Sequence, residues 1–127
     1  MPDPIARWQI VSPDPEQTVR FYERLFGWKS TQANAMGYRE LRTEVAPEGP
    51  VDGGVWPAPP GQGPMVQLYV EVNDVKAYAD KATKAGARIV VPPSVLPDGD
   101  EMAVLLDPMG MSFGICRLMR DATGRSK

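Results

Sequence analysis

The side chains available for chemistry in this sequence are an unusual set, because its 127 residues include one cysteine and no histidine. Imidazole is the commonest general base near neutral pH and the commonest transition-metal ligand in proteins. Its absence excludes Ser-His-Asp and Cys-His catalysis, and a single thiol cannot build a zinc site. Any metal ion would therefore need carboxylate, amide and water oxygens as ligands, and we predict no cofactor.

The remaining reactive groups are carboxylates and the lone thiol. Glu40, Glu44 and Glu71 could serve as a base, or as a non-standard oxygen site for magnesium or manganese. Cys116 is expected to be a small buried hydrophobic residue, because it lies on the expected last strand and follows no helix start that would favour a thiolate. The sequence alone leaves open whether the protein is an enzyme.

Composition limits the possible partners. The net charge of -2 argues against a nucleic-acid-binding surface, which needs a basic face. No apolar run is long enough to cross a membrane, and the first residues lack the basic and apolar regions of a signal peptide. We therefore expect one cytoplasmic domain with a small-molecule partner, and neither nucleic acid nor membrane.

The elements that would position these groups repeat along the chain. Residues 5–11 read as a strand, and Asp14-Pro15 then starts a helix that Gly27 ends. Further strands are expected at residues 28–30, 38–45 and 51–56. The Pro/Gly-rich stretch 57–64 cannot continue a strand or a helix, so it is expected to be a linker.

After that linker the same plan restarts. We expect a strand at 65–72, a helix from Asp74 to Gly86, and strands at 87–91, 101–106 and 112–118. This order predicts an α+β fold of two tandem βαβββ modules, about 5–56 and about 65–118, in one domain of residues 1–120 with a polar tail at 119–127. The alternative is that two unrelated α+β units share common cap and turn residues.

Four ordered motifs carry a family resemblance over about residues 5–118: Asp14-Pro15-Glu16 with Phe21–Trp28, Tyr69–Val75, Gly86–Val90 with Pro92-Pro93, and Asp107–Gly110 with Phe113-Gly114-Ile115. Together they resemble the glyoxalase, bleomycin resistance protein and extradiol dioxygenase (vicinal oxygen chelate) superfamily. The resemblance implies a curved glyoxalase-like sheet that forms a cleft, often in a homodimer.

The resemblance also implies where family metal ligands would stand. The first strand of each module would supply one ligand, at Arg7 and Gln67, and the last strand would supply one at Gly114. The fourth would lie near Gly54, with Asp52 as the nearby carboxylate. An arginine repels cations, glycine has no ligating side chain, and one amide does not hold a divalent ion. We therefore predict that the family metal site is absent.

Strand alternation extends this set to a cleft inventory. If Arg7 and Gln67 face the cleft, so do Gln9, Tyr69 and Glu71, whereas Trp8 and Ile10 point toward the helices. Nearby strands or loops could add three more residues: Tyr38, Trp56 and Met111. The structural alternatives are that Arg7 and Glu71 pair with each other, that the tyrosines are core or rim residues, and that Trp56 is a lid, a dimer contact or plain packing.

Three functions compete on this evidence. The first is a metal-free binding protein, similar to the bleomycin-resistance branch, that sequesters an aromatic or amphipathic ligand. The second is a lyase, isomerase or dioxygenase-like enzyme that uses cleft carboxylates or a non-standard metal site. The third is a structural or regulatory module with a vestigial cleft. The absent metal set beside Arg7, Trp56 and Tyr69 favours the first.

Overall fold

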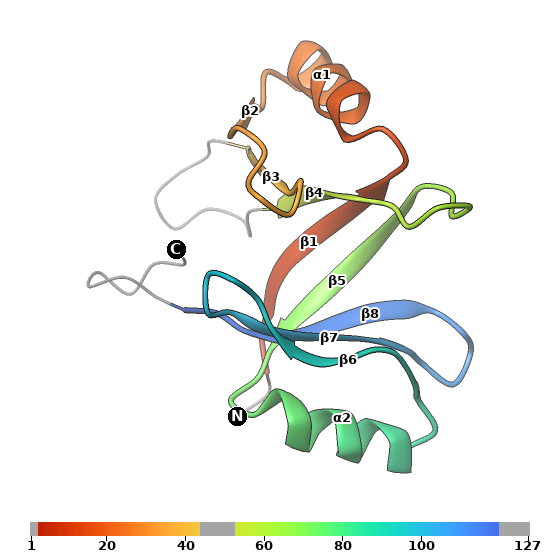
Figure 1. Cartoon of the computed structure of the whole chain (residues 1–127). Coiled ribbons are helices and arrows are strands. Elements are labelled where there is room, and N and C mark those ends of the chain that lie inside the picture. Colours follow the sequence, from red (N-terminus) through yellow and green to blue (C-terminus); the bar gives the residue numbers. More distant parts are fainter. Residues whose placement is uncertain (1–2, 44–52, 120–127) are drawn as a thin grey trace. The chain divides into compact units, whose positions relative to one another are not determined.

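The computed structural model describes residues 3–43 and 53–119. Its internal contacts divide the chain into a first unit, Ala6–Leu68, and a second unit, Met1–Ile5 with Tyr69–Lys127. The elements follow in this order (Figure 1): β1 (Ile5–Ser12), α1 (Pro15–Phe26), β2 (Lys29–Ser30), β3 (Arg39–Arg42), β4 (Gly53–Pro57), β5 (Met65–Glu71), α2 (Val75–Lys84), β6 (Arg88–Val95), β7 (Glu101–Leu106) and β8 (Ser112–Arg117). The predicted α+β fold of two βαβββ modules is confirmed.

In the first unit the strands lie in the order β2-β3-β4-β1. β1 and β4 are parallel, whereas β3 is antiparallel to both β2 and β4. The predicted helix start is confirmed, because the Asp14 carboxylate accepts a hydrogen bond from the Gln17 amide at 3.2 Å. The helix ends at Gly27, whose φ of 72° suits a residue without a side chain.

One face of this sheet packs against α1. Val19 of α1, Leu41 of β3 and Val55 of β4 are fully buried together. Trp8 and Ile10 of β1 pack against them, which confirms the prediction that these two side chains face a helix. Since side chains alternate along a strand, Arg7 and Gln9 lie on the opposite face of β1.

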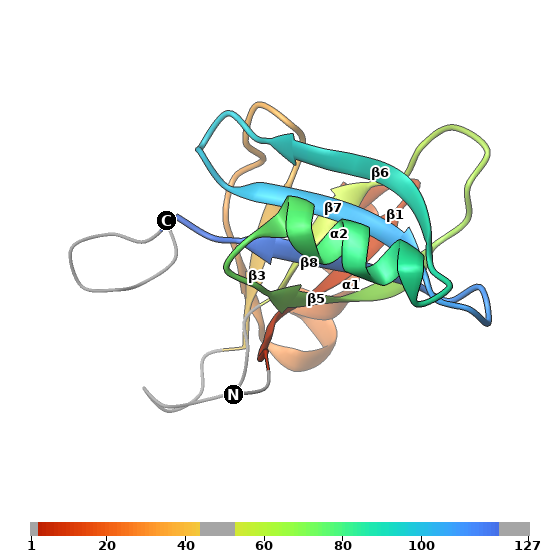
Figure 2. The ribbon, with the colours of Figure 1, turned by 90° about the horizontal axis from the view of Figure 1, so that it is seen from below.

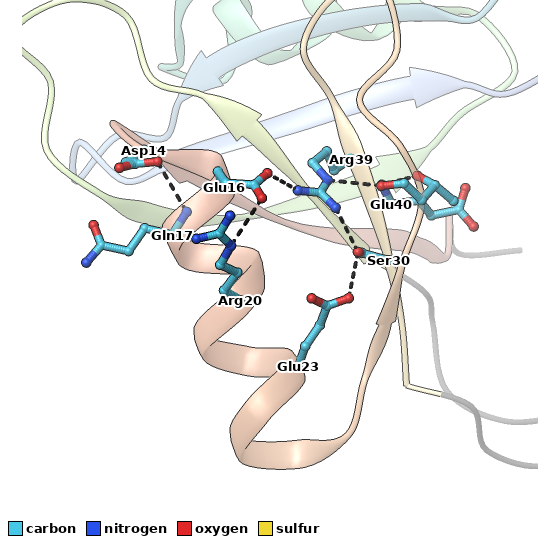
Figure 3. A network of polar contacts seen from close by, with 9 residues as sticks. Asp14, Glu16, Gln17, Arg20, Glu23, Ser30, Arg39 and Glu40 are labelled. Carbon is cyan, nitrogen blue, oxygen red and sulfur yellow. Dashed lines mark hydrogen bonds and ion pairs between the residues drawn. The ribbon is translucent and has the colours of Figure 1, made fainter.

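A polar network fastens α1 to the strands beside it (Figure 3). The Arg39 guanidinium donates to Glu16 near the start of α1, and at 3.0 Å to the Ser30 hydroxyl of β2. Ser30 in turn donates to Glu23 on the same helix at 2.8 Å. The Asp14 cap determines where α1 begins. The polar network helps to determine how α1 packs against β2 and β3.

In the second unit the strands lie in the order β5-β8-β7-β6. β5 and β8 are parallel, and the other two pairs are antiparallel. α2 begins where the Asp74 carboxylate accepts from the Ala77 amide at 3.0 Å, and it packs on β6, β7 and β8 (Figure 2). Six buried residues make this core: Val72, Val75, Ala79, Ala103, Leu105 and Ile115.

The largest strand extension beyond expectation is in β6. The strand expected at 87–91 runs from Arg88 to Val95, through Pro92 and Pro93. Proline is tolerated there because β6 is the last strand in the order, so one side of its backbone needs no donor. β3 ends at Arg42 and β4 begins at Gly53, while residues 44–52, with the candidates Glu44 and Asp52, lie outside the described residues.

Within the described residues, no helix is long and apolar enough to cross a membrane.

Candidate functional site

Four of the predicted ligand-binding residues meet on the face of the first unit opposite α1. In the register of β1 and β4, Gln9 pairs with Gly54 and Val11 with Trp56. Alternation therefore places Arg7, Gln9 and Trp56 on one face, beside Tyr38, which immediately precedes β3. We call Arg7, Gln9, Tyr38 and Trp56 the Tyr38 cluster.

Tyr38 is the centre of this cluster. Its hydroxyl accepts a long hydrogen bond from Arg7 Nη1, at 3.5 Å, and a second from the Gln9 side chain. Its ring lies 4.5 Å from the Trp56 ring, centroid to centroid, with a tilt of 40°. Tyr38 and Gln9 are 9% and 4% exposed, whereas Arg7 and Trp56 are half-buried, so the centre of the cluster is buried and its margin reaches solvent.

Because Gly54 has no side chain, the Tyr38 ring packs directly on the backbone of β4 there, and we call this position the Gly54 seat. A Cβ atom on Gly54 would lie 2.0 Å from the Tyr38 hydroxyl oxygen, which no real side chain tolerates. On the neighbouring residue, a Cβ atom at Gly53 would lie 2.1 Å from the Trp8 ring. Since adjacent strand residues face opposite ways, the Gly53-Gly54 pair lets aromatic rings approach both faces of β4.

Burial keeps the Tyr38 phenol neutral. Removal from water raises the pKa of Tyr38 above its ordinary value, and the carboxylate of Glu40 adds to that rise. The nearby Arg7 charge and the hydrogen bonds from Gln9 and Arg7 act in the opposite direction but do not overcome burial. At neutral pH the phenol can therefore both donate and accept a hydrogen bond.

Two polar atoms of the cluster are buried without a hydrogen-bond partner. They are the Gln9 side-chain carbonyl oxygen, Oε1, and the Trp56 indole nitrogen, Nε1. The only other such side-chain atom in the part of the chain that the structure describes is Thr43 Oγ1. Leaving a buried donor or acceptor unpaired costs about 1–3 kcal/mol. The cluster thus holds one unused acceptor and one unused donor.

The other predicted residues lie on β5 and in one turn. β5 gives Gln67 to the first unit and Tyr69 and Glu71 to the second. Gln67 and Tyr69 are buried, and Tyr69 pairs with Gly114 of β8. Met111 is 61% exposed in the turn between β7 and β8, where its amide donates to the Asp107 carboxylate. That turn keeps Met111 on the surface of the second unit.

Cys116 is buried in the second unit, opposite Glu71 on β5. Its thiol lies 3.8 Å from the Val70 carbonyl oxygen, a weak hydrogen bond. This environment agrees with the expectation of a small buried hydrophobic residue.

The residues at the positions that the family resemblance implies for metal ligands do not fit a divalent cation. Arg7 is a cation, and Gln67 offers one neutral amide. Gly54 and Gly114 offer none, and tyrosine rings fill the space above both, because a Cβ atom on Gly114 would lie 2.5 Å from the Tyr69 ring. The described residues also contain no group of three or more His, Cys, Asp or Glu placed to hold a metal.

The groove that the structure shows lies outside this cluster, along α1. This open groove of about 670 Å³ is lined in part by Arg20, Phe21, Arg24 and Leu25. The charges seen there are exposed, and Arg20 pairs with Glu16 at 3.2 Å (Figure 3). The groove holds no buried unpaired group, so we take the Tyr38 cluster as the candidate site.

The importance of Gly54 as a seat was not apparent from the sequence. The sequence suggested Gly54 only as a lost ligand position. The available signal was a Gly-Gly pair inside a strand, which often marks a close approach of other atoms to the backbone.

Comparisons with known proteins agree with this fold. The putative glyoxylase CFP32 of Mycobacterium tuberculosis (strain CDC 1551 / Oshkosh) is 28% identical over 109 residues, which cover 86% of this chain and 42% of that protein. The anthracycline biosynthesis protein DauV of Streptomyces sp. (strain C5) is 28% identical over 130 residues, covering 88% and 46%. This chain spans less than half the length of these relatives.

Solved structures share the fold at low identity. The hypothetical protein BH1468 from Bacillus halodurans C-125 has a TM-score of 0.67 at 14% identity, covering 96% of this chain and 99% of that one. Methylmalonyl-CoA epimerase from Mycobacterium tuberculosis has a TM-score of 0.63 at 16% identity, covering 89% and 86%. Residues 4–115 match the model of one family, and the chain therefore belongs to the Glyoxalase/Bleomycin resistance protein/Dioxygenase superfamily.

Proposed function

We propose that this protein binds a small aromatic or amphipathic molecule at the Tyr38 cluster without a metal ion. The observation that carries the proposal is the pair of buried, unused polar atoms, Gln9 Oε1 and Trp56 Nε1, beside an arginine and two aromatic rings in tilted contact. Binding sites typically combine apolar surface with a few placed polar groups of this kind. A ligand that supplied the missing hydrogen-bond partners would recover the cost of burying them.

Family membership supports binding of small molecules in general. Solved relatives of this fold include methylmalonyl-CoA epimerase in complex with methylmalonyl-CoA and NH4+, at 18% identity. At that identity the likeness concerns the fold alone. The choice of a metal-free binder over an enzyme rests on this chain's own residues, since Arg7, Gly54 and Gly114 occupy the positions at which the family resemblance implies metal ligands.

An enzyme is the second candidate, and Glu40 is the observation that favours it. Glu40 pairs with Gly54 across β3 and β4, which places it on the same face as Gln9, and its charge acts on Tyr38. A carboxylate beside a neutral phenol is a possible base and acid pair. However, Glu40 also forms an ion pair with Arg42 at 2.7 Å, which favours a structural role.

The deciding experiment uses untagged protein dialysed either against a chelator or against mixed divalent ions. Elemental mass spectrometry measures bound metal, and a thermal-shift panel of aromatic acids, aromatic amides and amphipathic natural products measures binding. We expect a ligand at a hundredfold excess over its Kd to raise Tm by roughly 10 °C in both preparations.

Matched variants locate the site. Gln9→Ala should remove most of that shift, whereas Gly63→Ala should preserve it, because a side chain at Gly63 meets nothing within 4 Å. Bound metal near one equivalent, or shifts seen only with metal, would contradict the proposal and favour the enzyme. The homodimer, the cytoplasmic location, the linker at 57–64 and the domain bounds remain predictions from the sequence.

A further inference from the structure

The Tyr38 cluster is buried in an arrangement that does not satisfy its own polar atoms. Tyr38 contacts both residues concerned, since it hydrogen-bonds Gln9 and its ring lies 4.5 Å from the Trp56 ring, centroid to centroid. Gln9 Oε1 and Trp56 Nε1 are nevertheless buried and unpaired. Buried polar groups in native proteins are almost always hydrogen-bonded, so an arrangement with two exceptions around one side chain calls for a functional reason.

The position of Tyr38 allows its ring to move. Its backbone is held by Asn34, whose carboxamide oxygen accepts from the Tyr38 amide at 3.0 Å, and Gly37 turns the chain there with φ of 80°. The ring itself rests on Gly54, where no side chain wedges it in place, and its bond from Arg7 is long at 3.5 Å. A change of χ1 rotamer would lift the ring and leave the backbone fixed.

We propose that Tyr38 is a displaceable cover over a polar floor made by Arg7, Gln9 and Trp56. This inference rests on the proposed function and names its ligand class. The ligand is a planar aromatic molecule with an acidic or carbonyl oxygen and a neighbouring N–H or O–H. The oxygen accepts from Arg7 and the Trp56 indole, the N–H or O–H donates to Gln9 Oε1, and the ring replaces the phenol on Gly54.

The test uses 1-anilinonaphthalene-8-sulfonate as the probe. Its naphthalene ring is planar, its sulfonate accepts hydrogen bonds, and its anilino N–H donates one. 8-Phenoxynaphthalene-1-sulfonate, in which an ether oxygen replaces the N–H, is the matched probe without the donor. Kd values are measured for wild type and for Tyr38→Ala, Gly54→Ala, Gln9→Met and the control Gly63→Ala. Near-UV circular dichroism checks that each variant is folded.

We expect Tyr38→Ala to bind the anilino probe on the order of tenfold tighter than wild type, because it need not first displace the ring. Gly54→Ala should bind the probe no tighter than wild type, because its Cβ atom fills the space that the ligand ring would take. Gly54→Ala acts by placing a Cβ atom 2.0 Å from the Tyr38 hydroxyl oxygen, so the ring must leave its seat. Gly63→Ala should match wild type within about twofold. Gln9→Met should bind both probes equally, because it lacks the acceptor that distinguishes them.

A second readout does not depend on any probe. The Trp56 indole N–H signal is assigned in the nitrogen-15 NMR spectrum with Trp56→Phe, and its hydrogen exchange is measured. Opening the cover exposes this group to water, so its exchange should be faster in Tyr38→Ala and Gly54→Ala. If Gly54→Ala fails to fold, Tyr38→Ala still gives both measurements.

Unchanged probe affinity and unchanged indole hydrogen exchange in a folded Tyr38→Ala variant would contradict the proposal that Tyr38 is a displaceable cover. If panel ligands still bound wild-type protein at this cluster in that case, the proposed function would stand without the cover. Failure of the probe and of the whole panel to bind any variant would remove both proposals.

Discussion

Both units place a tyrosine ring on a strand glycine, and the surroundings of the two rings differ. In the second unit Tyr69 and Gly114 are direct partners on neighbouring strands, so the ring position follows from strand register. In the first unit Tyr38 comes from the loop before β3, and its ring reaches Gly54 from outside that register.

The polar atoms around the two tyrosines differ as well. Around Tyr38 lie two unpaired buried atoms, Gln9 Oε1 and Trp56 Nε1. No such atom occurs among the described residues of the second unit. We interpret the Tyr69 pair as fixed packing and the Tyr38 pair as the functional one, and three changes test this contrast.

The largest effect is expected from adding a side chain at Gly54 or Gly114, the two glycines on which tyrosine rings pack. Gly114→Ala puts a Cβ atom 2.5 Å from the Tyr69 ring, which strand register holds in place. We expect it to lower the free energy of unfolding by about 3 kcal/mol, and Gly54→Ala by about 1 kcal/mol or less, because the Tyr38 ring can leave. Urea unfolding measures both, with Gly63→Ala as the control for the substitution itself. Equal losses at the two seats would remove the distinction between fixed and displaceable rings.

A smaller effect is expected from replacing buried glutamines. Gln9→Met removes an unpaired acceptor together with one hydrogen bond to Tyr38, so the free energy of unfolding should stay level or rise by up to about 1 kcal/mol. Gln67 is equally buried, at 5% exposure, and it takes part in an interaction with its surroundings. Gln67→Met should therefore cost about 1–2 kcal/mol. A larger loss in Gln9→Met than in Gln67→Met, measured by the same unfolding curves, would show that Gln9 is satisfied in solution.

The smallest effect concerns alkaline pH. The pKa of Tyr38 is raised by burial, so above pH 10, the ordinary value for tyrosine, the unfolded chain releases a proton that the folded chain keeps. The contribution of Tyr38 to stability is complete below pH 10 and is lost as the pH rises through its folded value. We expect the stability difference between wild type and Tyr38→Phe to shrink as the pH rises above 10.

Tyr78 offers a comparison for this pH dependence in the second unit. The pKa of Tyr78 is also raised, chiefly because its hydroxyl donates to the Asp3 carboxylate at 2.8 Å, but the pair is exposed to solvent. Tyr78→Phe should therefore change the alkaline slope less than Tyr38→Phe. A flat difference for Tyr38→Phe would mean that its phenol is already hydrated in the folded protein.

The sequence by itself determined the local features of this fold. Helix starts at Asp14 and Asp74 and the end at Gly27 follow from cap residues that satisfy nearby backbone groups. The two faces of β1, with Trp8 and Ile10 toward α1, follow from strand alternation. These rules act over a few residues, so they can be read without knowing the partner strands.

Only the tertiary structure decided the candidate site. Gly54 lies on β4, whereas Tyr38 lies in the loop before β3. No local rule predicts that the Tyr38 ring will pack on the backbone of Gly54. The same holds for β6, which continues through Pro92 and Pro93 because it is an edge strand. Strand order and register set which residues meet, and these depend on packing across the whole sheet, a property that a single segment does not carry.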